Sequence, residues 1–160
     1  MKKILCLLVA FTATFSVQAE STADQNLAAV DAQIALVRQV ANAQITAIVA
    51  ENVSFTAEEA EAFWPLYREY RAEFQKIGDG SLMLIKDFAK NYSDMSDKKA
   101  TELTDEALKL DQQRVKLQMS YAKKFRKVIK PAKVFRVFQV ENRVNAVNKL
   151  KLASEIPLMK

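Results

Sequence analysis

The chain has 160 residues, half of them hydrophobic, and its 24 basic and 19 acidic side chains give a formal net charge of +5. It contains no histidine, which is the commonest general base and transition-metal ligand, and only two glycines, too few for a phosphate-binding glycine loop. We therefore expect a protein that is not an enzyme and has no catalytic residue, no cofactor and no metal site.

The first nineteen residues have the pattern of a cleaved secretory signal peptide. Two lysines precede an apolar run over residues 4–15, and a small-x-small sequence ends at Ala19. The run is shorter than a membrane-spanning helix requires, so we expect cleavage after Ala19, with an uncleaved anchor as the alternative. The mature chain, residues 20–160, would then be one soluble exported domain without cysteine, because Cys6 leaves with the signal peptide.

The spacing of apolar residues predicts an all-α fold. Apolar side chains recur every three or four positions, strict alternation is absent, and glycine and proline are too rare for the many turns of a β protein. We expect four long helices with short loops, and short loops favour antiparallel neighbours. The predicted architecture is an elongated, bent array of helical hairpins.

The first helix is expected over residues 24–50, and the second is expected to begin at Thr56. Thr56 and Glu59 have the spacing of a capping box, in which each side chain accepts a hydrogen bond from the backbone N–H of the other. Pro65 removes one helical hydrogen bond and is expected to bend the second helix rather than end it. The apolar stripe keeps its phase across the glycines at 78–80, which favours one continuous helix over a break there.

The last two helices are expected from Ser96 to Val128 and from Pro131 to the region before Pro157. Proline is favoured at the first position of a helix and unfavourable inside one. The fourth helix has a broad apolar face and the first a narrow one, so neither is expected to be fully buried in a monomer. We therefore expect a homodimer.

Three predicted helix starts share one template: an apolar residue, a cap position and a long polar residue three positions after the cap. Two of these starts resemble the LTxxQ signature of the Spy/CpxP-like family of periplasmic proteins. The motif residues are Phe55, Thr56 and Glu59 in the first copy and Ile129, Pro131 and Lys133 in the second. The departures from the signature are Phe55 for Leu, Glu59 for Gln, Lys130 for Thr and Lys133 for Gln. The alternative is that helix starts look alike for physical reasons alone.

The resemblance covers residues 55–155 and extends to the signal peptide, the length and the helical pattern. It implies a periplasmic, ATP-independent chaperone that binds unfolded envelope proteins, or a regulator that docks on the periplasmic domain of a membrane stress sensor. It also implies that helical hairpins pair into a cradle-shaped homodimer. A metal-responsive role is disfavoured, because relatives with that role bind metals through histidine and other side chains, and this chain has no histidine.

Charge is divided along the mature chain. Residues 20–108 carry a net charge of −8, and residues 109–151 carry +11. In the densest basic run, residues 123–136, lysine and arginine are interleaved with aromatic side chains, a pattern that suits acidic partners. The predicted partner-binding residues are Lys123, Lys124, Arg126, Lys127, Lys130, Lys133, Phe135, Arg136 and Phe138. The alternative is a solvated helical face that the acidic half of the chain partly neutralises. Export disfavours nucleic acid as the partner.

Overall fold

The computed structural model of the protein describes residues 36–158, the side chain of Glu155 excepted. The predicted signal peptide and residues 24–35 of the first predicted helix lie outside this range. Within it the chain is helical with short connections and has no strand, which confirms the all-α prediction. The chain divides into two compact units, residues 1–41 and 42–160. Of the first unit the structure describes only residues 36–41, which are helical.

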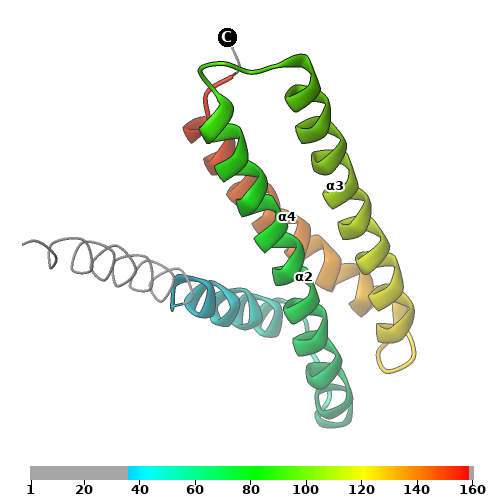
Figure 1. Ribbon diagram of the computed structural model, residues 1–160. Helices are drawn as coiled ribbons and strands as arrows, with labels where there is room; N and C mark the ends of the chain where they lie inside the picture. The colour runs from blue at the N-terminus through cyan, green and yellow to red at the C-terminus, as the bar shows by residue number, and fades with distance from the viewer. Residues whose placement is uncertain (1–35, 159–160) are drawn as a thin grey trace, which may run out of the picture. The chain divides into compact units, whose positions relative to one another are not determined.

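The second unit contains the end of the first helix and three complete helices. The first helix ends at residue 52, two residues later than predicted. It is followed by α2 (Ala57–Asn91), α3 (Asp97–Phe125) and α4 (Pro131–Glu155). Figure 1 shows α2 and α3 running antiparallel, with α4 returning across the pair from the end of α3. This arrangement confirms the predicted hairpin for α2 and α3, whereas α4 crosses the pair at an angle.

Helix α3 ends at Phe125, three residues before the predicted end at Val128. There the backbone hydrogen bonds change from the i→i−4 pattern of an α-helix to an i→i−3 pattern. The N–H of Lys127 donates to the carbonyl of Lys124 at 3.1 Å, and the N–H of Val128 donates to the carbonyl of Phe125 at 3.0 Å. Such i→i−3 bonds tighten the last turn of a helix and let the chain reverse. The turn leads directly into α4, which begins at Pro131 as predicted.

Helix α2 begins and continues as predicted. The N–H of Thr56 donates to Glu59 Oε2 at 2.9 Å, and the N–H of Glu59 donates to Thr56 Oγ1 at 3.2 Å, which is the predicted capping box. The helix continues past Pro65 and past both glycines, so the predicted continuous helix is confirmed and a break at the glycines is wrong. In Figure 1 α2 is one gently bent ribbon.

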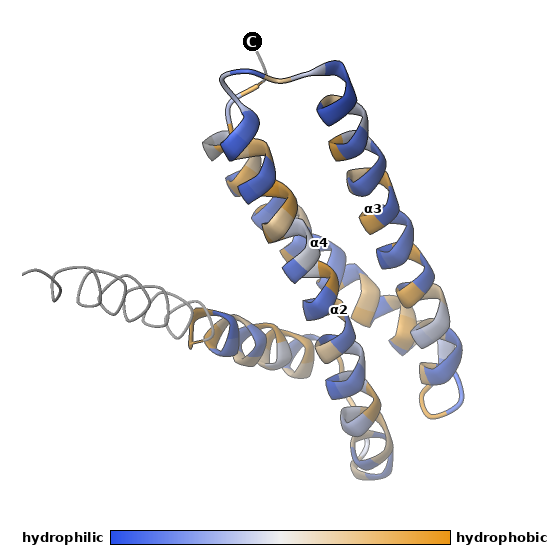
Figure 2. Ribbon diagram, in the orientation of Figure 1, coloured by the Kyte–Doolittle hydropathy of each residue, from blue (hydrophilic) through white to orange (hydrophobic). Residues whose placement is uncertain are grey.

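The core is an aromatic cluster where the three long helices cross. Residues of α2 at spacings of four and three lie on one face and supply most of its rings. The Tyr70 ring lies 5.4 Å from the Tyr121 ring of α3 and 6.0 Å from the Phe138 ring of α4. The buried members of this cluster are Val49, Val53, Phe63, Tyr67, Tyr70, Leu117, Tyr121, Phe125, Ile129, Val134, Val137 and Val140. Figure 2 shows the hydrophobic residues of α3 mostly on its side toward α2.

Two glycines in α2 are expected to respond differently to alanine. A Cβ added at Gly78 meets nothing within 4 Å, so Gly78→Ala should raise the free energy of unfolding by about 0.5–1 kcal/mol by relieving the cost of glycine in a helix. A Cβ added at Gly80 would lie 2.7 Å from Leu110 Cδ2 of α3, so Gly80→Ala should gain less. Urea unfolding of both variants checks this. An equal gain at the two sites would contradict the close approach of α2 and α3 at Gly80.

Candidate functional site

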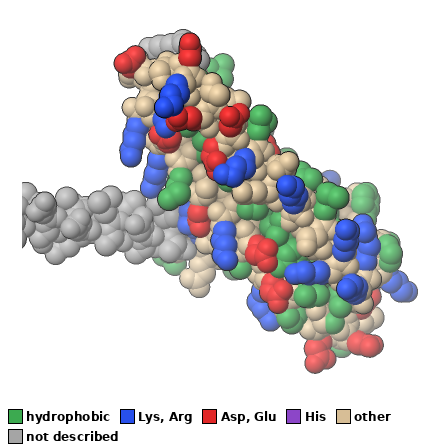
Figure 3. Space-filling model, turned by 45° about the vertical axis from the view of Figure 1, so that its right-hand side comes forward, with side chains coloured by type: hydrophobic (Ala, Val, Ile, Leu, Met, Phe, Trp, Pro, Cys, Tyr) green, Lys and Arg blue, Asp and Glu red, His purple; other side chains and the backbone are tan. Residues whose placement is uncertain are grey.

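The predicted partner-binding residues gather at the turn between α3 and α4, which we call the basic corner (residues 123–136). The exposed members are Lys123, Arg126, Lys127, Lys130, Phe135 and Arg136. Of these, Lys123, Arg126, Lys127 and Lys130 form no ion pair with any residue of the described range 36–158. Figure 3 shows lysine and arginine side chains among hydrophobic ones at the lower right of the molecule. The corner therefore presents positive charge at its surface.

The helix geometry explains how the basic corner tolerates this charge. The last turn of α3 carries Lys123 and Lys124, and cations near a helix C-terminus interact favourably with the helix dipole. The Lys124 ammonium lies 4.1 Å from the centre of the Tyr121 ring, a favourable cation–π contact. The Phe135 side chain, early in α4, is 67% exposed. The arrangement combines several cations with one apolar contact point.

Two of the predicted partner-binding residues have contacts with other helices. Lys133 Nζ donates a hydrogen bond to Glu59 Oε2 and forms an ion pair with it. The Phe138 ring is half-buried, 6.0 Å from the Phe125 ring. Both side chains thus help to hold the helices together.

The two copies of the helix-start template meet in space. Glu59 and Lys133 are each the third residue of their helix, α2 and α4, and they form the ion pair that joins the two starts. The hydrogen bond from Lys133, followed by that from the Thr56 N–H, holds the pKa of Glu59 below its usual value. The apolar residues of both copies pack inward. Phe55 stacks on Phe63 with ring centres 4.6 Å apart, and Ile129 is buried.

A buried polar network joins three helices, and the sequence did not predict it. Glu141 of α4 is fully buried. It accepts hydrogen bonds from Tyr67 Oη at 2.5 Å and from Arg71 Nη1 at 3.0 Å. Arg71 Nη2 also donates to Asn42 Oδ1 of the first helix at 2.7 Å. Burial raises the pKa of Glu141, although Arg71 and Tyr67 oppose this effect. A sequence signal existed, because Glu141 lies four residues after Val137 on the buried stripe of α4.

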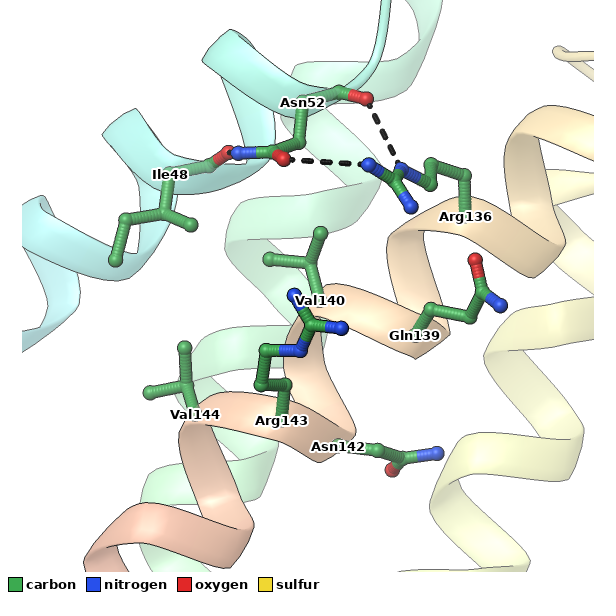
Figure 4. Close-up of a pocket in the computed structure, with 8 residues that line it drawn as sticks. All are labelled: Ile48, Asn52, Arg136, Gln139, Val140, Asn142, Arg143 and Val144. Carbon is green, nitrogen blue, oxygen red and sulfur yellow. Dashed lines mark hydrogen bonds between the residues drawn. The ribbon is translucent and has the colours of Figure 1, made fainter.

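A groove of about 410 Å³ lies between the end of the first helix and α4 (Figure 4). Its lining residues are Ile48, Asn52, Arg136, Gln139, Val140, Asn142, Arg143 and Val144. Arg136 bends toward Asn52, with Nε 3.4 Å from the Asn52 carbonyl oxygen and Nη2 3.4 Å from Asn52 Oδ1. Arg143 forms no ion pair with a residue in the described part of the chain. We call this feature the arginine groove. Arg136 is among the partner-binding residues that the sequence predicts, and Arg143 is not.

No group of three or more His, Cys, Asp or Glu that could hold a metal ion occurs within residues 36–158. No helix in that range has the length and apolar character needed to span a membrane. Comparisons with models of protein families, with curated proteins and with solved structures find no match to this chain. The arrangement at the basic corner and the arginine groove suits non-covalent binding of anionic partners.

Proposed function

We propose that the chain is an exported, Spy/CpxP-like periplasmic protein that binds unfolded or partner envelope proteins without catalysis or cofactor. The observation that carries this proposal is the basic corner, where four exposed cations without an ion pair in the described residues precede the exposed ring of Phe135 along the chain. The resemblance of the two helix starts to the LTxxQ signature supports the same function. A chaperone and a docking regulator of a membrane sensor would both use such a surface.

Binding at the basic corner would proceed in two physical steps. The positive field attracts acidic segments of an unfolded chain over a distance and raises the rate of encounter. Weak apolar contacts with Phe135 then hold the segment without fixing one geometry. Because Leu108, Val115 and Met119 on α3 are 64%, 53% and 60% exposed, we also expect the working form to be a homodimer.

Charge reversal at the basic corner tests the function. The mature chain, residues 20–160, should suppress aggregation of a chemically denatured acidic client without ATP. Reversing Arg126, Lys127 and Lys130 to Glu should slow association with the client about tenfold or more, because the attracting field is removed. The control reverses Lys76, Lys86 and Lys90, three exposed lysines of α2, so that the net charge changes equally. Light scattering and stopped-flow association measure the two effects, and solution mass reports the oligomer.

The outcomes separate the two versions of the function. The chaperone is supported if suppression of client aggregation weakens when Arg126, Lys127 and Lys130 are reversed and also when salt is added. Added salt shortens the electrostatic screening length below about 8 Å. Salt-sensitive binding to a single sensor domain, with little protection of clients, favours the regulator. Equal loss in the corner variant and in the α2 control would contradict a localised surface. No suppression and no partner binding by the wild type would overturn the proposal.

A further inference from the structure

We propose that the arginine groove is a specific site for acidic peptide segments that carry a bulky apolar side chain next to a carboxylate. The inference rests on the proposed function in one respect, that the partners are polypeptides. It goes beyond that function because it assigns a defined recognition site, with a chemical preference, outside the basic corner. The site is formed by the end of the first helix and the middle of α4.

The two guanidinium groups supply the recognition of carboxylate. Arginine presents a planar set of donors that matches a carboxylate and binds it in a bidentate manner. Arg136 and Arg143 are seven residues apart, so they lie on one face of α4 about 10 Å apart along its axis. The contacts with Asn52 hold Arg136 in place, and Arg143 is exposed. The groove thus has one oriented and one adaptable donor group.

The base of the groove supplies the apolar contact. Val140 is 7% exposed, Ile48 is 36% exposed, and Val144 is half-buried. Figure 4 shows Val140 and Arg143 on α4, with Ile48 across from them on the first helix. A volume of about 410 Å³ is within the range of roughly 300–1,000 Å³ that is typical of sites for small ligands. The groove is therefore large enough for a side chain together with its own backbone.

The remaining lining groups favour a peptide over other anions. Among the residues that the structure describes, no carboxylate lines the groove, so a cationic ligand would find no charged partner among them. The other polar groups are the amides of Asn52, Gln139 and Asn142, which match the donors and acceptors of a peptide backbone. The Asn142 amide is turned toward α3, where its Oδ1 lies 3.4 Å from Gln118 Nε2. The Asn52 amide donates to the Ile48 carbonyl at 2.8 Å and accepts from Arg136, so Gln139 is the amide that remains next to the two arginines to bind a backbone.

The same face of α4 continues the site. Val147 and Leu150 follow Arg143 by four and seven residues and are both exposed. These spacings place them in line with the two arginines along the helix. A segment with its carboxylate on Arg143 would meet apolar surface on both sides, at Val140 and at Val147. The order of charged and apolar groups along α4 thus complements an acidic–apolar peptide.

Fluorescence anisotropy of short labelled peptides tests the inference. The probes are a peptide of alternating Glu and Leu, its Gln and Leu counterpart, and its Glu and Ser counterpart. The wild type should bind the first peptide more tightly than the other two. Arg143→Gln should weaken this binding about tenfold, the loss expected for a charged hydrogen-bonded contact. Ile48→Ser should weaken it several-fold by removing apolar contact, with circular dichroism confirming that each variant is folded.

The matched control is Arg68→Gln, which removes the same charge from an exposed arginine of α2 that lies outside both the groove and the basic corner. It should weaken peptide binding less than about threefold, since it changes only the long-range field. Equal losses in the two variants, or equal affinity for the Gln and Leu peptide, would overturn the groove site. Binding of vesicles containing phosphatidylglycerol in place of the peptide, with loss in Arg143→Gln, would assign the groove to a lipid surface and would also overturn the inference.

The aggregation assay separates this inference from the proposed function. If the wild type suppresses aggregation but Arg143→Gln binds the peptide as the wild type does, the groove site is wrong and the general binding function stands. If the wild type neither suppresses aggregation nor binds a partner protein, the proposed function fails. Peptide binding that is lost in Arg143→Gln would still support the groove in that case, as a site for acidic peptides alone.

Discussion

Replacing Phe125 with alanine should lower the free energy of unfolding by about 3–5 kcal/mol, the cost of removing a buried ring from a core. Phe125 is fully buried at the last position of α3. Its ring lies 5.0 Å from the Phe63 ring and 6.0 Å from the Tyr70 ring, both of α2, and 6.0 Å from the Phe138 ring of α4. One side chain thus joins three helices, and a cavity there would loosen all of them. Urea unfolding followed by circular dichroism measures the change.

The matched control is Phe135→Ala, the same substitution ten residues later. Phe135 is 67% exposed on α4, so its loss should change the free energy of unfolding by less than about 0.5 kcal/mol. The comparison is direct because both variants remove the same ring. A cost at Phe135 as large as that at Phe125 would contradict the orientation of α4. It would also remove Phe135 from the exposed surface of the basic corner.

Replacing Arg71 with methionine should destabilise the protein by about 3–5 kcal/mol near neutral pH, because the carboxylate of Glu141 would lose its charged partner. Glu141 is fully buried, and its remaining hydrogen-bond donor would be Tyr67. The variant also loses the hydrogen bond from Arg71 to Asn42, which connects α2 to the first helix. Adding Glu141→Leu should recover most of the stability, because no buried charge remains. If the double variant is as unstable as the single one, the cost does not come from an unpaired carboxylate.

The buried carboxyl of Glu141 also makes the free energy of unfolding depend on pH. Burial raises the pKa of Glu141 in the folded protein above its unfolded value of about 4.3. The folded state therefore binds the proton of the Glu141 carboxyl more tightly than the unfolded state does. The contribution of this proton to the free energy of unfolding is fully present below the pKa of Glu141 in the unfolded chain, and it is lost as pH rises through the pKa of Glu141 in the folded protein. Relative to Glu141→Gln, the wild type should lose stability as pH rises through this window. A difference that stays constant with pH would contradict a raised pKa.

The local features of the fold could be predicted from the sequence. The capping box at Thr56 and Glu59 depends on residues three apart, and the start of α4 at Pro131 depends on the fixed backbone of proline. The end of α3 could not be predicted to the residue. The apolar stripe continues to Val128, but the backbone changes to i→i−3 hydrogen bonds after Phe125. Side-chain periodicity does not report that change.

The candidate site was predicted only in part. The sequence located the basic corner because cations and aromatic residues are dense there, and Lys130 and Phe135 are exposed. It could not separate the exposed Lys130 from the half-buried Lys133, whose side chain forms an ion pair with Glu59. It also missed Arg143, because a single arginine on a helix has no distinctive spacing. The importance of Arg143 comes from Ile48 across the groove, on a different helix.

The sequence by itself determined the helical class, the continuous α2 and its capped start, because these depend on backbone propensity and on contacts within about one helical turn. The division of charge between the two halves of the chain was likewise a property of the sequence alone. Only the tertiary structure decided which charged side chains pair with one another within the protein. Glu59 meets Lys133 and Arg71 meets Glu141 across separations of 74 and 70 residues, through helix packing that periodicity does not specify. That packing leaves Arg143 and four cations of the basic corner, Lys123, Arg126, Lys127 and Lys130, without an ion pair in the described residues.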